Sequence, residues 1–187
     1  SRAGTEFEYQ SNHYFLPLFG AHNAVNSLPG LWLAHELGVP TQTVQAALAS
    51  VSYVPHRLEP TQLEHGILLL DNGYNSTPAS ARESLAVLQA LDAPQKIVST
   101  PGFVELGPTQ AAENETLGKE IAAIADLCIV IKSVNARAII NGLRAGGFRE
   151  AQIILAQNEA EGMNLVSKFT KPNAIILFEN SVPELYK

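Results

Sequence analysis

The stretch Leu68-Leu69-Leu70-Asp71-Asn72-Gly73-Tyr74-Asn75-Ser76-Thr77-Pro78 decides the fold, because an apolar run ends there in polar residues and a glycine before a helix begins. A short buried strand followed by such a turn holds its polar side chains at the carboxyl edge of a sheet, where open α/β folds bind ligands. The stretch therefore predicts a ligand site, and we expect nucleotide chemistry there.

Short apolar runs recur from residue 66 onward, each too short for a helix and rich in Ile, Leu and Val. They predict strands over residues 67–70, 97–98, 128–131, 153–155 and 174–178. Helical spacing between them predicts helices over residues 78–91, 108–125, 136–143 and 159–169. Because strand and helix alternate and the strands are apolar throughout, we expect an α/β fold with a doubly wound, mostly parallel sheet covered on both faces.

The first 54 residues follow a different pattern. Residues 1–17 lack helical spacing and predict one or two strands of a sheet whose remaining strands lie elsewhere. Residues 27–37 and 41–49 predict two short helices. Two prolines, Pro55 and Pro60, make the following segment irregular. We therefore place a domain boundary within residues 51–60.

Composition excludes several classes of protein. The net charge of -6 argues against non-specific binding of nucleic acid, whose phosphate backbone attracts the opposite charge. The apolar runs are shorter than the roughly 18 residues that cross a bilayer, and residues 1–4 contain no signal-peptide core, so we expect no membrane partner. Cys128, the one cysteine, lies in an apolar run and is predicted to be buried. Without a disulfide or a cysteine-rich zinc site, a cytoplasmic location fits best.

Two candidate binding groups lie outside the opening stretch. Asn23 and Asn26 are three residues apart, so in a helix that starts at or before Asn23 their amides share one face and can hold a polar heterocycle. The alternative is that one of them caps the helix. Arg57, next to His56 at the domain boundary, is suited to binding phosphate oxygens, and the alternative is a structural ion pair with Glu59 or with a neighbouring domain.

The carboxyl ends of the predicted strands define a candidate surface at one edge of the sheet. It collects residues 71–77, 99–107, 133–135, 157–158 and 179–183. Residues 99–107 form an unusually long connection, of the kind that often carries function. The sequence contains no glycine-rich phosphate loop, His-Glu-x-x-His or Gly-x-Ser-x-Gly motif. A nucleotide-using enzyme would therefore need its phosphate loop from another domain, and we assign no catalytic residue and no metal ligand.

Four ordered motifs resemble the C-terminal half of the Mur ligases, and most closely the MurF type. They are Gly20-x-His22-Asn23-x-x-Asn26, His56-Arg57, Asp71-Asn72-Gly73-Tyr74-Asn75-Ser76-Thr77-Pro78 and Glu105-Leu106-Gly107. The ending from Phe178 to Tyr186 is also similar to the tail of some MurF-like proteins. The similarity covers nearly the whole chain, and the motifs are specific together although each alone is weak.

The resemblance implies the end of a central ATPase domain over residues 1–54 and a Rossmann-like C-terminal domain over residues 55–187. It implies a ligase that uses ATP and Mg²⁺ to activate a carboxylate of a UDP-muramoyl tripeptide as an acyl phosphate, which the amine of D-alanyl-D-alanine attacks. The N-terminal and central domains of the same chain are then its partners. Carried over by position, the nucleotide-binding residues are His22, Asn23, Asn26, Arg57, Asp71, Asn72, Tyr74 and Asn75. For Tyr74 and Asn75 the resemblance leaves open whether they contact the nucleotide or the amine.

Two positions depart from the family's turn. Its second Asp, which resembles a ribose-binding carboxylate, is Asn72 here, and its later Asn is Thr77. An amide carbonyl still accepts a hydrogen bond from a ribose hydroxyl, but it lacks the charge that makes a carboxylate a stronger acceptor. Asp71 could replace the family's second Asp only from the other face of the strand, because adjacent side chains of a strand point to opposite faces.

Two other interpretations stay open. One is another Mur-related ATP-dependent ligase, similar to MurT, folylpolyglutamate synthase or cyanophycin synthetase, although the lack of a four-cysteine cluster counts against the MurT-like version. The other is a non-catalytic α/β module that binds a nucleotide or a partner without turnover. Asn72 and the lack of a phosphate loop favour this module.

Overall fold

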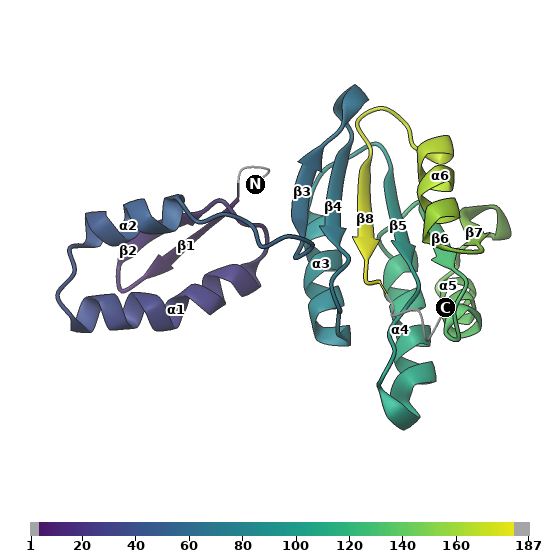
Figure 1. The fold of residues 1–187 in the computed structure, drawn as a ribbon, viewed down its shortest axis with the longest axis horizontal. Coiled ribbons are helices and arrows are strands. Elements are labelled where there is room, and N and C mark those ends of the chain that lie inside the picture. The colour runs from purple at the N-terminus through teal and green to yellow at the C-terminus, as the bar shows by residue number, and fades with distance from the viewer. Residues whose placement is uncertain (1–3, 182–187) are drawn as a thin grey trace. The chain divides into compact units, whose positions relative to one another are not determined.

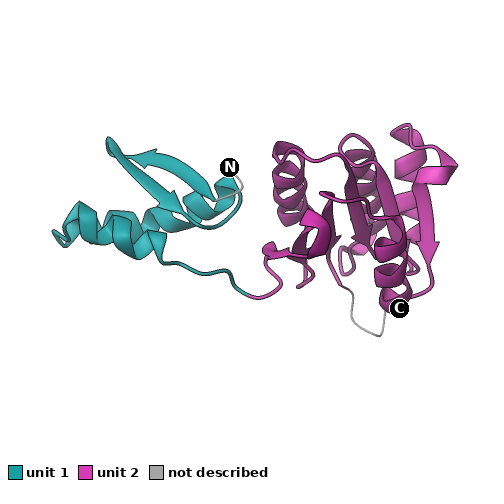
Figure 2. Cartoon of the chain, turned by 90° about the horizontal axis from the view of Figure 1, so that it is seen from above, with its two compact units in different colours: residues 1–54 teal, residues 55–187 magenta. Residues whose placement is uncertain are grey.

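A computed structural model describes residues 4–181, and the chain divides into two compact units, residues 1–54 and 55–187 (Figure 1, Figure 2). In the first unit, β1 (Thr5–Tyr9) and β2 (Asn12–Leu16) form an antiparallel hairpin. The turn residues Gln10 and Ser11 have positive φ angles of 47° and 62°, as a tight two-residue hairpin loop requires. The segment predicted as one or two strands therefore forms two.

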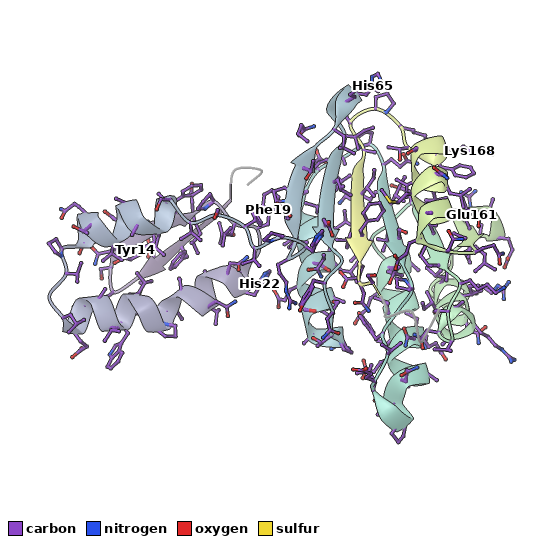
Figure 3. The ribbon with its side chains drawn as sticks, in the orientation of Figure 1. Tyr14, Phe19, His22, His65, Glu161 and Lys168 are labelled. Carbon is purple, nitrogen blue, oxygen red and sulfur yellow. The ribbon has the colours of Figure 1, made fainter. Side chains whose placement is uncertain are left out.

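Two helices complete this unit, α1 (Ala21–Glu36) and α2 (Thr41–Ala49). α2 has the predicted bounds, but α1 begins at Ala21 rather than at residue 27. Gly20, with a φ of 94°, is the N-cap residue, so the alternative that an asparagine caps this helix is wrong. The rings of Tyr14 and Phe19 are buried in the core of this unit (Figure 3).

The second unit is built on a six-stranded sheet with the order β3-β4-β8-β5-β6-β7. The strands are β3 (Glu59–Gln62), β4 (Leu68–Asn72), β5 (Lys96–Thr100), β6 (Leu127–Ile131), β7 (Ile153–Ala156) and β8 (Ile175–Glu179). All neighbouring pairs are parallel except β3 and β4, which are antiparallel. The prediction of a mostly parallel α/β sheet is thus confirmed, whereas β3, in a segment expected to be irregular, was missed. Pro60 is tolerated there because β3 is an edge strand.

Helices cover both faces of the sheet (Figure 1). α3 (Pro78–Ala90), α4 (Gln110–Ala122) and α5 (Ala136–Ala145) follow β4, β5 and β6 and lie on one face, while α6 (Glu159–Phe169) leads back from β7 to β8 and lies on the other. Three short 3-10 turns, η1 (Glu64–Gly66), η2 (Gly107–Thr109) and η3 (Glu150–Gln152), complete the connections. Because β8 lies between β4 and β5, it is a direct neighbour of β4, the strand in the stretch from Leu68 to Pro78.

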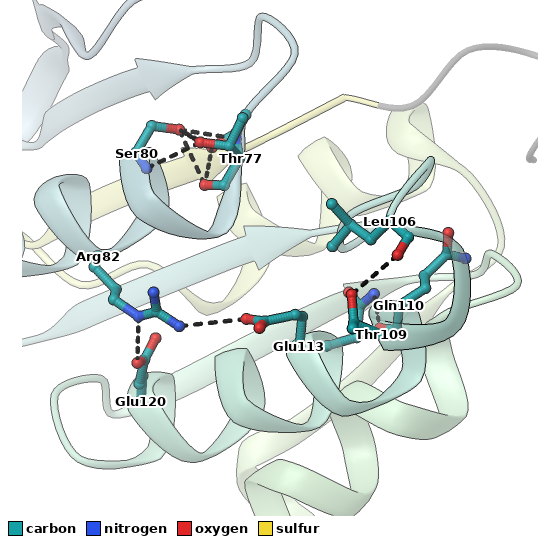
Figure 4. Close-up of polar contacts among 10 residues, drawn as sticks. Thr77, Ser80, Arg82, Leu106, Thr109, Gln110, Glu113 and Glu120 are labelled. Carbon is teal, nitrogen blue, oxygen red and sulfur yellow. Dashed lines mark hydrogen bonds and ion pairs between the residues drawn. The ribbon is translucent and has the colours of Figure 1, made fainter.

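The sequence fixes the start of α3 through a local hydrogen-bond pattern (Figure 4). Thr77 accepts a hydrogen bond from the backbone N–H of Ser80, whose hydroxyl accepts one from the N–H of Thr77, and Pro78 occupies the first turn. The polar turn after β4 therefore ends sharply at Thr77. Two residues after Ser80, Arg82 donates to Glu120 over 2.9 Å and to Glu113 over 3.3 Å, which links α3 to α4.

The core on the α6 side of the sheet consists of aliphatic side chains from β5 to β8 and from α6. Its buried members are Ile97, Leu127, Ile129, Ile131, Ala156, Val166 and Ile176. Leu69 of β4 and Phe178 of β8 are partly buried and pack against this layer. Within residues 4–181, none of the helices has the length and apolar character needed to span a bilayer.

Candidate functional site

A pocket of about 420 Å³ lies at the carboxyl edge of the sheet in the second unit, on the face that α6 covers. Its volume is within the range of about 300–1,000 Å³ that is typical of small-molecule sites. The lining residues come from the segment before β3, from the ends of β4, β5, β6 and β8, and from α6: His56, Asp71, Gly73, Tyr74, Ser99, Pro101, Ile131, Glu159, Met163, Phe178, Asn180 and Ser181.

Alternation along β4 decides which polar side chain reaches the pocket. Asp71 lines it, whereas Asn72 points to the opposite face of the sheet, is buried, and donates hydrogen bonds of 3.1 and 3.2 Å to the carboxylate of Glu179. The residue at the position of the family's second Asp is therefore turned away from the pocket. The carboxylate that this strand offers to a ligand is Asp71.

Asp71 is held by two hydrogen bonds. Its Oδ2 atom lies 2.8 Å from Nδ1 of His56, and its Oδ1 atom accepts from the backbone N–H of Gly73 over 2.9 Å. The backbone carbonyl of His56 in turn accepts from the N–H of Tyr74 over 3.2 Å. The hydrogen bond to Asp71, and then its negative charge, raise the pKa of His56. The first residues of the second unit are thus fixed to the turn after β4.

Arg57 lies against the same turn. Its guanidinium carbon is 4.6 Å from the centroid of the Tyr74 ring, which is within the range of a cation–π contact. Glu59, the alternative partner considered for this arginine, accepts a hydrogen bond from the backbone N–H of His56 over 3.2 Å. Asn75 is exposed in the turn with a φ of 39°. The structure therefore brings together Arg57, Asp71 and Tyr74, and leaves Asn75 beside them at the surface.

The long loop after β5, within residues 99–107, borders the pocket. Two buried asparagines form hydrogen bonds with its backbone. Asn114 of α4 accepts from the N–H of Phe103 over 2.8 Å and donates to its carbonyl over 2.9 Å. Asn135, just before α5, donates to the same carbonyl over 2.7 Å. Gly102 has a φ of 81°, and an added Cβ would lie 2.2 Å from Oδ1 of Asn114. The sequence pattern singled out the loop and residues 133–135, which include Asn135, but Asn114 was missed, because one polar residue in a helix looks like any other.

His22, Asn23 and Asn26 belong to α1 in the first unit. Asn23 and Asn26 lie inside the helix and both line a second, mostly apolar cavity of about 560 Å³ between α1 and α2. The side-chain amide of Asn23 donates to the carbonyl of Phe19 over 2.7 Å, while Asn26 is exposed. Their shared face fits the expectation for a helix that starts before Asn23. Their part in nucleotide binding stays a prediction.

The pocket lining combines apolar side chains with two carboxylates. Pro101, Met163 and Phe178 supply apolar surface, and Asp71 and Glu159 supply the carboxylates. Glu159 accepts a hydrogen bond of 2.8 Å from the hydroxyl of Ser181. The described lining residues include no Lys or Arg. Among residues 4–181, no group of three or more His, Cys, Asp or Glu side chains is arranged to hold a metal ion.

Comparison with known proteins gives a consistent result. No family model matches the chain. The UDP-N-acetylmuramoyl-tripeptide--D-alanyl-D-alanine ligase of Haemophilus influenzae is 33% identical over 131 residues, which are 70% of this chain and 28% of that protein. The ligase of the same name from Escherichia coli is 33% identical over 124 residues, 64% of this chain and 27% of that protein. The chain therefore spans less than a third of the length of these relatives.

Solved structures show the same fold. The MurF ligase from Thermotoga maritima in complex with ADP superposes with a TM-score of 0.78 at 22% identity, over 94% of this chain and 39% of that one. A MurF structure from Acinetobacter baumannii gives a TM-score of 0.77 at 24% identity, over 91% and 37% of the two chains. These structures show the fold, and the relative that is 33% identical over 70% of this chain shows that the chain belongs to the Mur ligase family and is of the MurF type.

Proposed function

We propose that the full-length protein is a cytoplasmic ATP-dependent amide ligase of peptidoglycan precursor synthesis, which adds D-alanyl-D-alanine to a UDP-muramoyl tripeptide through an acyl phosphate. The names of the bacterial relatives support this reaction. Residues 1–54 would then be the end of the central ATPase domain and residues 55–187 the C-terminal domain. The observation that carries the proposal is the convergence of His56, Asp71 and Tyr74 on one pocket at the carboxyl edge of the sheet.

Arg57 is the residue that we assign to the phosphates of ATP. It is exposed, and its contact with the Tyr74 ring restrains the guanidinium beside the pocket. A planar guanidinium binds phosphate oxygens through paired N–H groups and keeps its charge at every physiological pH. Arg57 would therefore bind the triphosphate and stabilise negative charge as the phosphoryl group is transferred.

The interior of the pocket suits the amine acceptor better than a triphosphate. The carboxylates of Asp71 and Glu159 would repel phosphate oxygens but attract an ammonium group. Met163 and Phe178 offer apolar contact for the methyl groups of a dipeptide of alanine. We therefore place D-alanyl-D-alanine in the pocket and the nucleotide phosphates at its Arg57 side.

ATP, when bound, supplies the phosphoryl group that activates the substrate carboxylate, and Mg²⁺ offsets the charge of its phosphates. Mg²⁺ in such sites is usually held by substrate phosphates together with one or two carboxylates, so the phosphates of ATP would supply part of its ligands. The residues of this chain then bind the nucleotide and the acceptor and exclude water from the acyl phosphate.

The test is phosphate release by the full-length protein with ATP, a UDP-muramoyl tripeptide and D-alanyl-D-alanine. We expect release that requires the dipeptide. Replacing Arg57 by Ala should mainly raise the KM for ATP, whereas Asp71→Asn and Glu159→Gln should mainly raise the KM for the dipeptide. Arg144→Ala is the matched control, because this exposed arginine pairs with Glu150 at the end of α5, away from the pocket.

Each outcome separates the candidate functions. Dipeptide-dependent release with these two KM patterns supports the ligase and both assignments. Release with a different amine would retain the ligase but replace its acceptor. A folded full-length protein that releases no phosphate with any amine would overturn the ligase in favour of a non-catalytic module.

A further inference from the structure

Glu179 and Asn180 lie at the end of β8, between the turn after β4 and the loop after β5. They belong to none of the four ordered motifs, although the ending from Phe178 to Tyr186 includes them. Glu179 is completely buried and Asn180 is 8% exposed. Buried polar side chains in a small domain need hydrogen-bond partners, and the partners of these two come from elements far apart in the sequence.

The carboxylate of Glu179 is surrounded by neutral donors. Asn72, its register partner on β4, donates to both oxygens, at 3.2 and 3.1 Å. The hydroxyl of Ser84 on α3 donates a third hydrogen bond, and the hydroxyl of Ser76 contributes a fourth. Replacing a buried charge by an apolar side chain of similar size is often neutral or stabilising, so bulk stability alone does not explain a glutamate here. What this network adds is a fixed geometry between β8, β4 and α3.

Asn180 extends the network to the two loops. Its Oδ1 atom accepts from the backbone N–H of Ser76 over 2.8 Å, and its Nδ2 atom donates to the carbonyl of Gly102 over 2.7 Å. Its own N–H donates to the carbonyl of Asn72 over 3.1 Å. The residue adopts a φ of 66°, a left-handed conformation that asparagine tolerates better than most residues. One side chain therefore joins the turn after β4 to the loop after β5.

We propose that Glu179 and Asn180 are positioning residues, which hold the 73–77 turn and the 101–103 loop in register around the pocket. The inference rests on the proposed ligase function. Gly73 and Tyr74 from the turn, and Pro101 from the loop, line the pocket directly, as does Asn180 itself. A shift of either segment would move these walls, and a displacement of about 1 Å is enough to cost a reaction two orders of magnitude in rate.

Asn72 belongs to the same hydrogen-bond network. It is the donor that faces Glu179, so an aspartate at this position would bring two buried carboxylates together. A double variant with both Asn72→Asp and Glu179→Gln, which we call the exchanged pair, keeps one carboxylate and one amide in contact. If the pair acts as a unit, Asn72→Asp alone should impair the protein and the exchanged pair should restore it.

The first test measures amide hydrogen exchange in the 187-residue chain, with and without Asn180→Ala. We expect the Ser76 amide to exchange about tenfold faster in the variant, because its acceptor is removed. Gln95→Ala is the matched control. Gln95 is also 8% exposed and also bonds two backbone groups, the carbonyl of Phe169 and the N–H of Lys171, but it does so where β5 and β8 begin. It should leave the Ser76 rate within about twofold of the original.

The second test uses the full-length protein. Asn180→Ala should lower kcat/KM by about tenfold or more, while Gln95→Ala at the same folded fraction should not. Asn72→Asp should lower kcat/KM similarly, and the exchanged pair should return it to within about threefold of the original value.

The outcomes distinguish this inference from the proposed function. An unchanged Ser76 exchange rate in Asn180→Ala, or an equal acceleration in Gln95→Ala, overturns the positioning role whatever the activity. An exchanged pair as impaired as Asn72→Asp alone overturns the paired action of Asn72 and Glu179. Absence of ligase activity in the unaltered full-length protein would remove the proposed function, and the exchange measurement would then decide the positioning role by itself.

Discussion

His56 and Asp71 are joined by a hydrogen bond of 2.8 Å between Nδ1 and Oδ2, which connects the first residues of the second unit to the end of β4. The bond and the charge of Asp71 raise the pKa of His56. A histidine whose pKa is raised in the folded state stabilises the fold fully below its unfolded pKa of about 6.5, and this contribution is lost as the pH rises through the raised value.

We predict that Asp71→Asn lowers the pKa of His56 toward its ordinary value, because the charged acceptor is removed. Titration of the His56 ring protons by NMR measures this directly. Glu59→Gln is the control, since the charge of Glu59 is the last and weakest of the causes that shift the pKa of His56. It should lower the pKa of His56 less than Asp71→Asn does. An equal or smaller effect of Asp71→Asn would show that the hydrogen bond does not form.

The buried carboxylate of Glu179 predicts the pH dependence of stability. Burial raises its pKa, and the hydrogen bonds from Ser76, Ser84 and Asn72 offset only part of the shift. Because the folded state holds this proton more tightly than the unfolded state, Glu179 makes the free energy of unfolding fall as the pH rises from about 4.5 through the raised pKa, by at most about 1.4 kcal/mol per pH unit.

Denaturant titrations from pH 4 to 8 should show this fall in the original chain, and Glu179→Gln should reduce it. Glu150→Gln is a control of opposite sign. Arg144 lowers the pKa of Glu150, so its stabilising contribution is present above the unfolded pKa and is lost as the pH falls. Parallel pH profiles for the original chain and Glu179→Gln would mean that Glu179 titrates as it does in the unfolded chain.

Much of the fold could be predicted because it depends on local patterns. Short apolar runs locate the strands, and helices between them imply a mostly parallel sheet. Helical spacing also predicted α6 with its observed bounds. The position of β8 between β4 and β5 was not predictable in this way, because a run such as residues 174–178 is equally apolar in any place within a buried sheet. β3 was missed because its sequence, Glu-Pro-Thr-Gln, lacks apolar residues.

The location of the candidate site was predictable, but the hydrogen-bond partners of its residues were less so. The abrupt end of the apolar run at Asp71 located the pocket edge, and strand alternation already implied that Asp71 and Asn72 face opposite sides. The partner of Asn72 is Glu179, 107 residues further along the chain, and no local pattern links the two. Hydrogen bonds between side chains of distant elements form only once the strand order is known.

Cys128 should be unreactive in the folded protein. It is completely buried in β6, and burial raises the pKa of its thiol to about 12. Since the thiolate is the reactive form, a thiol reagent such as 5,5′-dithiobis(2-nitrobenzoic acid) at pH 8 should react only as fast as the chain opens. We expect one thiol per chain to react promptly in denaturant. Equally rapid reaction without denaturant would contradict the burial of this strand.

Close contact between α4 and α5 depends on two glycines that face each other. A Cβ added at Gly142 would lie 1.9 Å from the carbonyl oxygen of Glu115, and one added at Gly118 would lie 2.2 Å from the carbonyl oxygen of Ile139. Gly142→Ala should therefore force the helices apart at a cost of about 1–3 kcal/mol. Helix propensity returns roughly 1 kcal/mol of this, so the free energy of unfolding should fall by up to about 2 kcal/mol. Asn141→Ala, at the exposed neighbouring position of the same helix, should stabilise slightly. Urea denaturation of both variants measures the difference. A stabilised Gly142→Ala variant would mean that the helices are further apart than described.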